Sequence, residues 1–216
     1  MSLTPVHIEF IATGALWTVG LSAIAFVGGS ILGFALALAR ISPVPFVRRC
    51  AGTYIQIVQG TPLLVTLFLF YFGLAVVGFD SLPAIVAAGL GLVIYSSAFL
   101  AEIWRGCLES VPKTQWEAAE CLALTRWQRM VRVILPQAMR IATAPTVGFL
   151  VQIVKNTSLA SVVGFVELAQ AGKLVNNTIF EPFTVFIVVA AFYFVICYPL
   201  SAWSRSLERK LNAGRR

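Results

Sequence analysis

The segment of residues 113–133 concentrates charged side chains of both signs, and the chemistry they can perform is recognition of a partner. Glu117 and Glu120 lie three residues apart and give one short helix a polar face. A second short helix has an arginine at every third position, opposite an apolar face: Arg126, Arg129 and Arg132. Arginines alone fit a surface of anionic lipid, whereas the glutamates and the small Ala118-Ala119 pair favour a groove in a protein. Both partners stay open on these residues.

The other polar residues do not form a pattern typical of catalysis or metal binding. The sequence has a single histidine, His7, and no paired carboxylates or metal-ligand spacing. The four cysteines include no CxxC pair, which favours free structural thiols: Cys50, Cys107, Cys121 and Cys197. The sequence lacks a G-x-x-x-x-G-K-S/T phosphate loop, so the chain cannot bind ATP by that route. We therefore expect no catalytic residue, no metal site and no cofactor bound by this chain.

The composition is that of an integral membrane protein. Hydrophobic residues make up 59% of the chain and charged residues only 12%, about half of their share in soluble proteins. Four windows without a charged residue are long enough, at roughly 20 residues, to span a bilayer as a helix. They lie between Glu9 and Arg40, between Arg49 and Asp80, between Asp80 and Glu102, and between Glu181 and Arg205. A shorter apolar window, from Arg140 to Lys155, is predicted as a fifth span.

We predict an all-α fold, a single membrane domain over residues 1–216 with five transmembrane helices and the charged segment 113–135 outside the bilayer. The spans are expected at about 10–39, 57–78, 84–106, 137–157 and 182–204. The first apolar run lacks a basic leader and is too long for a signal-peptide core, so we expect a retained helix. Pro136 is expected to start the fourth span, because proline is tolerated in a first helical turn.

Small and helix-breaking residues predict how the spans pack and bend. A ridge of small residues recurs at four-residue intervals in the first span: Gly29, Gly33 and Ala37. Such a ridge lets another helix approach closely, and packing within the chain is favoured over a subunit interface. Gly60-Thr61-Pro62 predicts a break in the second apolar run. Prolines predict a short turn at residues 42–49 and an outer turn at residues 80–83.

Two groups of polar residues lie near the ends of predicted spans. Glu102 is the acidic residue closest to a span interior, and Arg105 follows three residues later on the same helical face. A local ion pair and a functional role are equally compatible with that spacing. A second group lies where the fourth span ends: Lys155, Asn156, Thr157 and Ser158. Residues 162–177 then look like an outer loop with a short helix.

The basic residues predict the orientation of the chain. With five spans, fourteen of the sixteen Lys and Arg residues lie on one side: Arg40, Arg48, Arg49, Arg105, Lys113, Arg126, Arg129, Arg132, Arg140, Arg205, Arg209, Lys210, Arg215 and Arg216. Only Lys155 and Lys173 lie on the other side. By the positive-inside rule, the N-terminus is outside and the C-terminus is in the cytoplasm. The net charge of +7 therefore reflects membrane topology, and we expect no nucleic-acid partner.

The stretch EAAECLALTRWQRMVRVILP, residues 117–136, resembles the cytoplasmic EAA motif of ATP-binding-cassette (ABC) importer permeases. That motif is commonly written EAA, three residues, Gly, nine residues, I-x-LP. The matching positions are Glu117, Ala118, Ala119, Val133, Leu135 and Pro136. Three further stretches resemble the polar amino acid branch of the family: QGTPLLVTLFLFYFGL, SSAFLAEIWRGCLESVPKTQWEAA and KNTSLASVVGFVEL. The resemblance covers roughly residues 10–205.

The sequence departs from the family pattern at three positions. Ala123 replaces the motif's glycine, so it is strained if that position needs a positive φ and suitable if it needs only a small side chain. Thr114 replaces a glycine that often precedes the motif. Asn156 replaces the aspartate of the KDTSL-like stretch, which removes a negative charge near the expected substrate path and argues against a strongly cationic substrate.

The resemblance implies a permease subunit that moves polar amino acids into the bacterial cytoplasm across the inner membrane by alternating access. ATP and Mg²⁺ would be bound by separate ABC ATPase subunits, and an extracytoplasmic solute-binding protein would deliver the substrate. A second permease subunit, identical or similar, is expected because one five-span chain is too small to enclose a path. The residues expected to couple to the ATPase are Glu117, Ala118, Ala119, Ala123, Leu135 and Pro136.

The residues expected along the substrate path are Asn156, Thr157 and Ser158, with help from Glu102 and Thr61. Together they offer donors for a carboxylate and acceptors for an ammonium group, as a zwitterion requires. Helix capping is the alternative for Asn156, Thr157 and Ser158. A channel or secondary transporter for small polar solutes is the main rival function, and a membrane enzyme is the next. The spans are nearly free of the charges that ion coupling would need.

Overall fold

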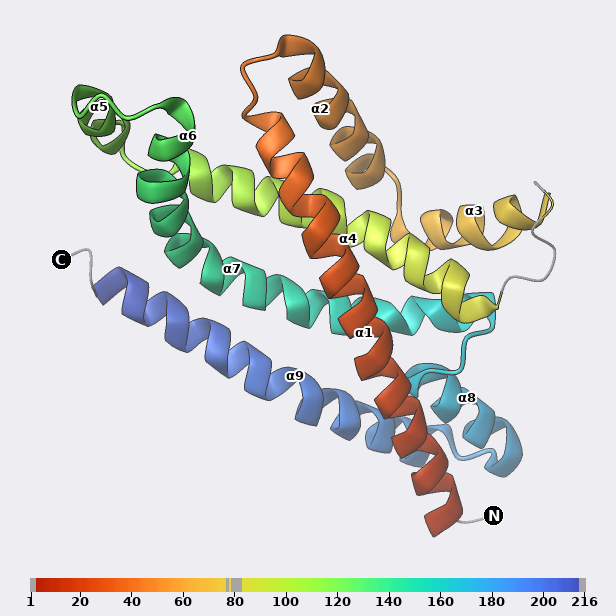
Figure 1. The fold of residues 1–216 in the computed structure, drawn as a ribbon. Helices are drawn as coiled ribbons and strands as arrows, with labels where there is room; N and C mark the ends of the chain where they lie inside the picture. The colour runs from red at the N-terminus through yellow and green to blue at the C-terminus, as the bar shows by residue number, and fades with distance from the viewer. Residues whose placement is uncertain (1–2, 77, 79–82, 214–216) are drawn as a thin grey trace.

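The computed structural model describes residues 3–76, 78 and 83–213, and these residues form helices and connecting turns without a strand. The all-α prediction is thus confirmed for this part of the chain. The elements in Figure 1 are α1 Pro5–Arg40, α2 Pro45–Gly60, α3 Leu63–Val76, α4 Ala84–Glu109, α5 Lys113–Cys121, α6 Arg126–Arg129, the π-helical turn η1 Met130–Ile134, α7 Leu135–Asn156, the 3-10 helix η2 Thr157–Val163, α8 Leu168–Ile179 and α9 Pro182–Ala213.

Within the described part of the chain, four helical stretches are long and apolar enough to cross a membrane: α1, α4, the continuous stretch Arg126–Val163, and α9. The bent pair α2 and α3 would together supply a fifth. Figure 1 shows α5 and α6 near the end of α4, close to the last turns of α1. We call this side of the bundle the coupling end, after the role that the sequence analysis expects for residues 113–135. α8 lies at the opposite end, beside the first turns of α1 and α9 (Figure 1).

The ridge of small residues on α1 packs against α4. A Cβ placed on Gly29 would come within 2.6 Å of the Ser96 Cβ, and one on Gly33 within 2.9 Å of the Ser97 carbonyl oxygen. Real Cβ atoms do not come this close, so only glycine permits the spacing of these two helices. The prediction that this ridge serves packing within the chain is confirmed.

The second apolar run is broken where Gly60-Thr61-Pro62 predicts a break. α2 and α3 meet there at an angle of 101°. Their bounds differ from the predicted span of 57–78, and the turn predicted at 42–49 is wrong, because α2 already begins at Pro45. Proline is well suited to a first helical turn, since it has no N–H to leave unpaired. The outer turn predicted at 80–83 lies outside the described residues, apart from its last position.

The charged segment contains only one separate short helix, α5. The predicted second helix begins at Arg126 but continues through η1 into α7, so it is the first part of a long helix. Pro136 lies in the first turn of α7, as predicted, but α7 continues from η1 without a break. Proline cannot donate to the carbonyl four residues before it and clashes with that group. The wider π-helical turn just before Pro136, in which Leu135 N–H donates to the Met130 carbonyl, gives the chain a way to continue past it.

The outer segment after η2 is packed rather than loose. α8 buries Leu168, Ala171 and Val175. Leu168 and Val175 join a hydrophobic cluster that includes Ile11 of α1 and Val185 of α9. A Cβ on Gly14 would lie 2.7 Å from the Ala171 Cβ, so α8 touches the backbone of α1. This helix is thus a structural part of the bundle.

Candidate coupling and substrate-path sites

α5 presents the first residues of the EAA stretch at the surface of the coupling end. Glu117 and Ala118 are exposed, whereas Ala119 is buried. Trp116, on the same helix, packs on a hydrophobic cluster that includes Leu108 of α4. The inner face of α5 is thereby fixed on the bundle, and its outer face is free to meet another molecule.

Ala123 ends α5 in a left-handed conformation, with φ of 53°. The Ala123 N–H donates to the Glu120 carbonyl (2.9 Å), and the Leu124 N–H donates to the Ala119 carbonyl (3.3 Å). These two bonds define a Schellman motif, in which the residue with positive φ is usually glycine. Of the two alternatives drawn from the sequence, the strained one is therefore correct: this position needs a positive φ, and its Cβ is unfavourable there.

A few polar contacts hold α5 to the helix that follows it. The Arg129 guanidinium lies 3.1 Å from the Glu120 carboxylate, which is itself 70% exposed. The Gln137 amide donates to Gln115 at 3.3 Å. Exposed ion pairs contribute only about 0–1 kcal/mol, so these contacts orient α5 more than they stabilise it.

The start of α6 has its own cap, and the end of the EAA stretch is anchored by packing. The Thr125 side chain accepts from the Gln128 N–H (3.3 Å), and the Gln128 side chain accepts from the Thr125 N–H (3.0 Å), which is a capping box. Leu135 packs on the cluster around Leu108, whereas Pro136 is exposed. Some residues of the EAA stretch therefore lie at the outer surface, whereas others pack on the bundle.

The structure brings three of the substrate-path candidates together at the far end of α7. The Thr157 hydroxyl is fully buried and donates to the Val154 carbonyl, and the Ser158 hydroxyl donates to the Lys155 carbonyl, each at 2.8 Å. Both hydroxyls therefore act as local helix caps. Asn156 differs, because its Oδ1 accepts from Gln152 (3.0 Å) while its buried Nδ2 has no partner among the described residues.

The other two candidates lie elsewhere. Glu102, in the last third of α4 near the coupling end, accepts from Arg105 (2.6 Å) and from Arg40 of α1 (3.3 Å). The ion pair is thus the structural role that the geometry supports for it. Thr61 lies at the α2–α3 break, where its hydroxyl donates to the Ile57 carbonyl (2.8 Å).

A buried acidic residue that the sequence analysis did not single out holds α8 in place. Glu167 is fully buried and caps α8, accepting from the N–H groups of Ala169 (2.9 Å) and Gln170 (2.8 Å). The Tyr193 hydroxyl of α9 (2.9 Å) and the Thr18 hydroxyl of α1 (3.4 Å) donate to the same carboxylate. Burial raises the pKa of the Glu167 carboxyl, and the donors oppose that rise by favouring the charged form.

Among the acidic residues that the structure describes, Glu167, and not Glu102, is thus the most buried. The only signal in the sequence is a lone acid just before LAQAG, a helix-forming stretch within an apolar segment. An acidic residue directly before a helix is typical of an N-cap. Its partners Thr18 and Tyr193 are more than 20 residues away along the chain, so no local pattern connects them to it.

Residues 26–213 match the family described as binding-protein-dependent transport system inner membrane component, and the chain belongs to that family. Among curated proteins, it is 36% identical over 201 residues to a probable amino-acid ABC transporter permease protein, YckA, of Bacillus subtilis (strain 168), covering 93% of this chain and 88% of that protein. It is 38% identical over 191 residues to a probable glutamine ABC transporter permease protein, GlnM, of the same strain, covering 88% of each chain.

A solved structure has the same fold. The chain superposes on a crystal structure of an amino acid ABC transporter with histidines at a TM-score of 0.89, with 31% identity, covering 97% of this chain and 100% of the other. The resemblance to ABC importer permeases drawn from the sequence is confirmed. The chain is a multi-pass inner-membrane transport component.

Proposed function

We propose that this chain is the permease subunit of an ATP-driven importer that moves polar amino acids into the cytoplasm. The observation that carries the cargo class is the set of relatives named above, which are amino acid and glutamine permeases matched over most of their length. The bent pair α2 and α3 then counts as one span, which gives five spans with the N-terminus outside and the C-terminus inside.

The outer face of α5 is the proposed contact for a separate ABC ATPase. Glu117 and Ala118 are exposed there, while Ala119 and Leu135 fix the segment on the bundle. An ATPase that closes on ATP and Mg²⁺ would move α5, and the continuous helix from Arg126 to Val163 would transmit that motion through the membrane. Two such permease subunits, identical or similar, would alternate between inward-open and outward-open states.

On the substrate path, Asn156 is the residue with a free hydrogen-bond donor. Its Nδ2 can donate to the carboxylate of an amino acid delivered by an extracytoplasmic binding protein. Replacing Asn156 with Leu is expected to abolish uptake while the transporter still assembles. The matched control is Ser158→Ala, which removes only a local helix cap. Normal uptake by the Asn156→Leu protein would remove this residue from the path.

The proposed coupling contact is tested by co-purification. The chain, tagged at its C-terminus, is extracted in mild detergent as wild type, as Glu117→Arg and as the control Glu208→Arg. Glu208 is also exposed and lies near the C-terminal end of α9, so the control makes the same change of charge away from α5. We expect an ABC ATPase to remain with the wild type and the control and to be lost from Glu117→Arg. Retention by all three proteins would contradict the proposed contact.

Uptake into sealed vesicles separates an importer from the rival functions. Transport of labelled amino acids is expected to require ATP on the side of the ATPase and to proceed without a proton or sodium gradient. Uptake that needs no ATP would favour a channel, and uptake driven by an ion gradient would favour a secondary transporter. Mass spectrometry of the co-purified wild-type complex distinguishes a homodimer from a heterodimer.

A further inference from the structure

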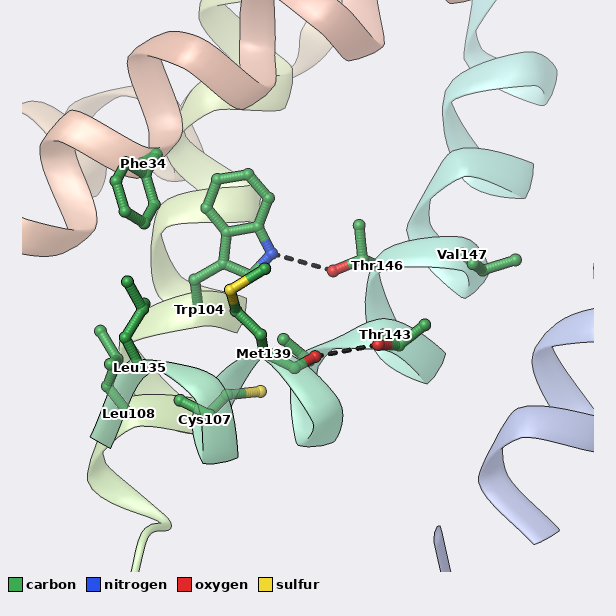
Figure 2. A pocket seen from close by; sticks show the side chains of 11 residues that line it. Phe34, Trp104, Cys107, Leu108, Leu135, Met139, Thr143, Thr146 and Val147 are labelled. Atoms are coloured by element: carbon green, nitrogen blue, oxygen red, sulfur yellow. Dashed lines mark hydrogen bonds between the residues drawn. The ribbon is translucent and has the colours of Figure 1, made fainter. Parts of the chain in front are cut away.

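A cavity of about 420 Å³ opens on the side of the bundle between α1, α4 and α7 (Figure 2). Its walls include Phe34 of α1, Trp104 and Cys107 of α4, and Met139 and Thr143 of α7. Met139 is 61% exposed and Phe34 is 40% exposed, so the cavity is a groove that opens at the protein surface. Its volume lies in the range of about 300–1,000 Å³ that is usual for small-molecule sites. We call it the α4–α7 groove.

The polar groups in the α4–α7 groove are already bonded to each other or to their own helix. The Trp104 indole N–H donates to the Thr146 hydroxyl (2.9 Å), and the Thr143 hydroxyl donates to the Met139 carbonyl (2.9 Å), as Figure 2 shows. The rest of the lining is predominantly apolar. An amino acid bound there would have to leave its charges unpaired, which is costly. The occupant of this groove is therefore apolar.

The length of the groove matches one leaflet of a bilayer. Along α7, its lining runs from Leu135 to Val147, twelve steps of about 1.5 Å or about 18 Å in all. Half of a hydrocarbon core about 30 Å thick is about 15 Å. Phe34, Trp104 and Leu135 all lie in the half of their helices nearer the coupling end. The groove therefore spans the leaflet next to α5 and α6.

Two arginines lie close along the chain to residues that line the groove. Arg132, in η1, precedes Leu135 by three residues, and Arg140, on α7, directly follows Met139. Both arginines are exposed. Arginine binds phosphate through paired N–H groups and reaches the headgroup layer from within the membrane. The helix that lines the groove therefore carries positive charge on its exposed side.

We propose that the α4–α7 groove binds one acyl chain of an anionic phospholipid, with Arg132 and Arg140 facing its phosphate. The inference rests on the proposed orientation, which puts the coupling end at the cytoplasmic leaflet, where anionic lipids attract basic residues. The bound lipid contacts α4 and α7 at once. It lies beside the helix that leads from α6 into the membrane, the same helix through which we propose that the ATPase acts.

The test uses the complete transporter in bilayers that contain phosphatidylglycerol with a photoactivatable diazirine in the middle of its acyl chain. After irradiation, labelled peptides are identified by mass spectrometry. Label is expected to concentrate on residues 104–108 and 138–147, and not on the exposed face of α9 around Phe194 and Val195. Unlabelled phosphatidylglycerol is expected to compete better than phosphatidylcholine.

Two kinds of variant sharpen the result. Thr143→Phe and, independently, Ala142→Phe fill the groove and are expected to abolish labelling of both peptides, so that one informative variant remains if the other fails to fold. Arg132→Gln combined with Arg140→Gln is expected to lower the preference for phosphatidylglycerol by up to about 30-fold. The matched control, Arg48→Gln combined with Arg49→Gln, makes the same change of charge on α2 and is expected to leave the preference unchanged.

Label spread evenly over α7 and α9, or equal competition by the two lipids, would overturn the proposal. So would cross-links from the groove to a second copy of the chain, because the occupant would then be a subunit. The proposed orientation is checked separately by the protection of a C-terminal tag from protease added to intact cells. A cleaved tag would refute the orientation, whereas a protected tag with unlabelled grooves would refute the lipid site alone.

Discussion

At the α8 end of the bundle, Glu167 is fully buried and accepts hydrogen bonds that tie α1, α8 and α9 together. At the coupling end, Glu117 is exposed, and the neighbouring Glu120, also exposed, forms one ion pair with Arg129, whose side chain is 15% exposed. α5 also ends at Ala123 in a conformation that costs energy for any residue with a Cβ. The comparison separates a region in which buried hydrogen bonds tie three helices together from a region in which charged side chains stay at the surface.

The largest expected effect is at Glu167. Glu167→Ala leaves two backbone N–H groups and two hydroxyls without their acceptor in a buried site, and each unpaired group costs about 1–3 kcal/mol. We expect a loss of stability of about 3 kcal/mol or more, or failure to accumulate as a monodisperse protein. Thermal unfolding in detergent, followed by size-exclusion chromatography of a fluorescent fusion, measures this.

Two further variants test whether the effect belongs to the buried carboxylate. Tyr193→Phe removes one donor and is expected to cost less than Glu167→Ala, about 1 kcal/mol. Glu9→Ala removes an exposed acid from the same end and is expected to change the stability by less than about 0.5 kcal/mol. If the Glu167→Ala protein were as stable as the Glu9→Ala protein, the buried hydrogen bonds of Glu167 would not stabilise the α8 end. The proposed difference between the α8 end and the coupling end would then be wrong.

A gain in stability is expected at Ala123. Glycine has no Cβ to clash at φ of 53°, so Ala123→Gly should stabilise the end of α5 by about 1 kcal/mol. Hydrogen exchange of residues 113–123 measures this locally, and slower exchange is the expected result. The control is Ala118→Gly inside the same helix, which should speed exchange, since glycine costs about 0.5–1 kcal/mol there. Faster hydrogen exchange of residues 113–123 in both variants would contradict the backbone strain at Ala123.

The smallest expected effect is at the exposed ion pair. Glu120→Gln removes the charge that faces Arg129, and the expected loss is between about 0 and 1 kcal/mol and smaller at high salt. Unfolding measured at low and at high ionic strength gives the difference. A loss as large as that of Glu167→Ala would mean that the coupling end is held more firmly than its exposure indicates.

The sequence was sufficient for features that depend on local composition. The apolar windows, the break at Gly60-Thr61-Pro62 and the exposed EAA stretch could all be predicted because hydropathy, proline and charge act within a few residues. Helix bounds next to prolines were less predictable. Pro45 begins α2 after a turn, whereas Pro136 lies in the first turn of α7, which continues from the π-helical turn η1 without a break.

The candidate sites needed the fold. Asn156, Thr157 and Ser158 look alike as polar neighbours, yet two of them bond to their own helix and only Asn156 keeps a free donor. Glu102 pairs with Arg105, as its spacing allows, but its second partner, Arg40, comes from α1 and lies 62 residues away. Side-chain hydrogen bonds depend on which helices become neighbours, and helix spacing alone does not specify that.

The sequence by itself determined that this is a helical membrane protein, because the cost of burying charge in lipid acts on every residue wherever its neighbours are. The tertiary structure decided that Glu167 is buried and paired and that the groove between α4 and α7 stays open. These features come from contacts between helices distant in the chain, whose close packing determines which polar groups meet and which spaces remain.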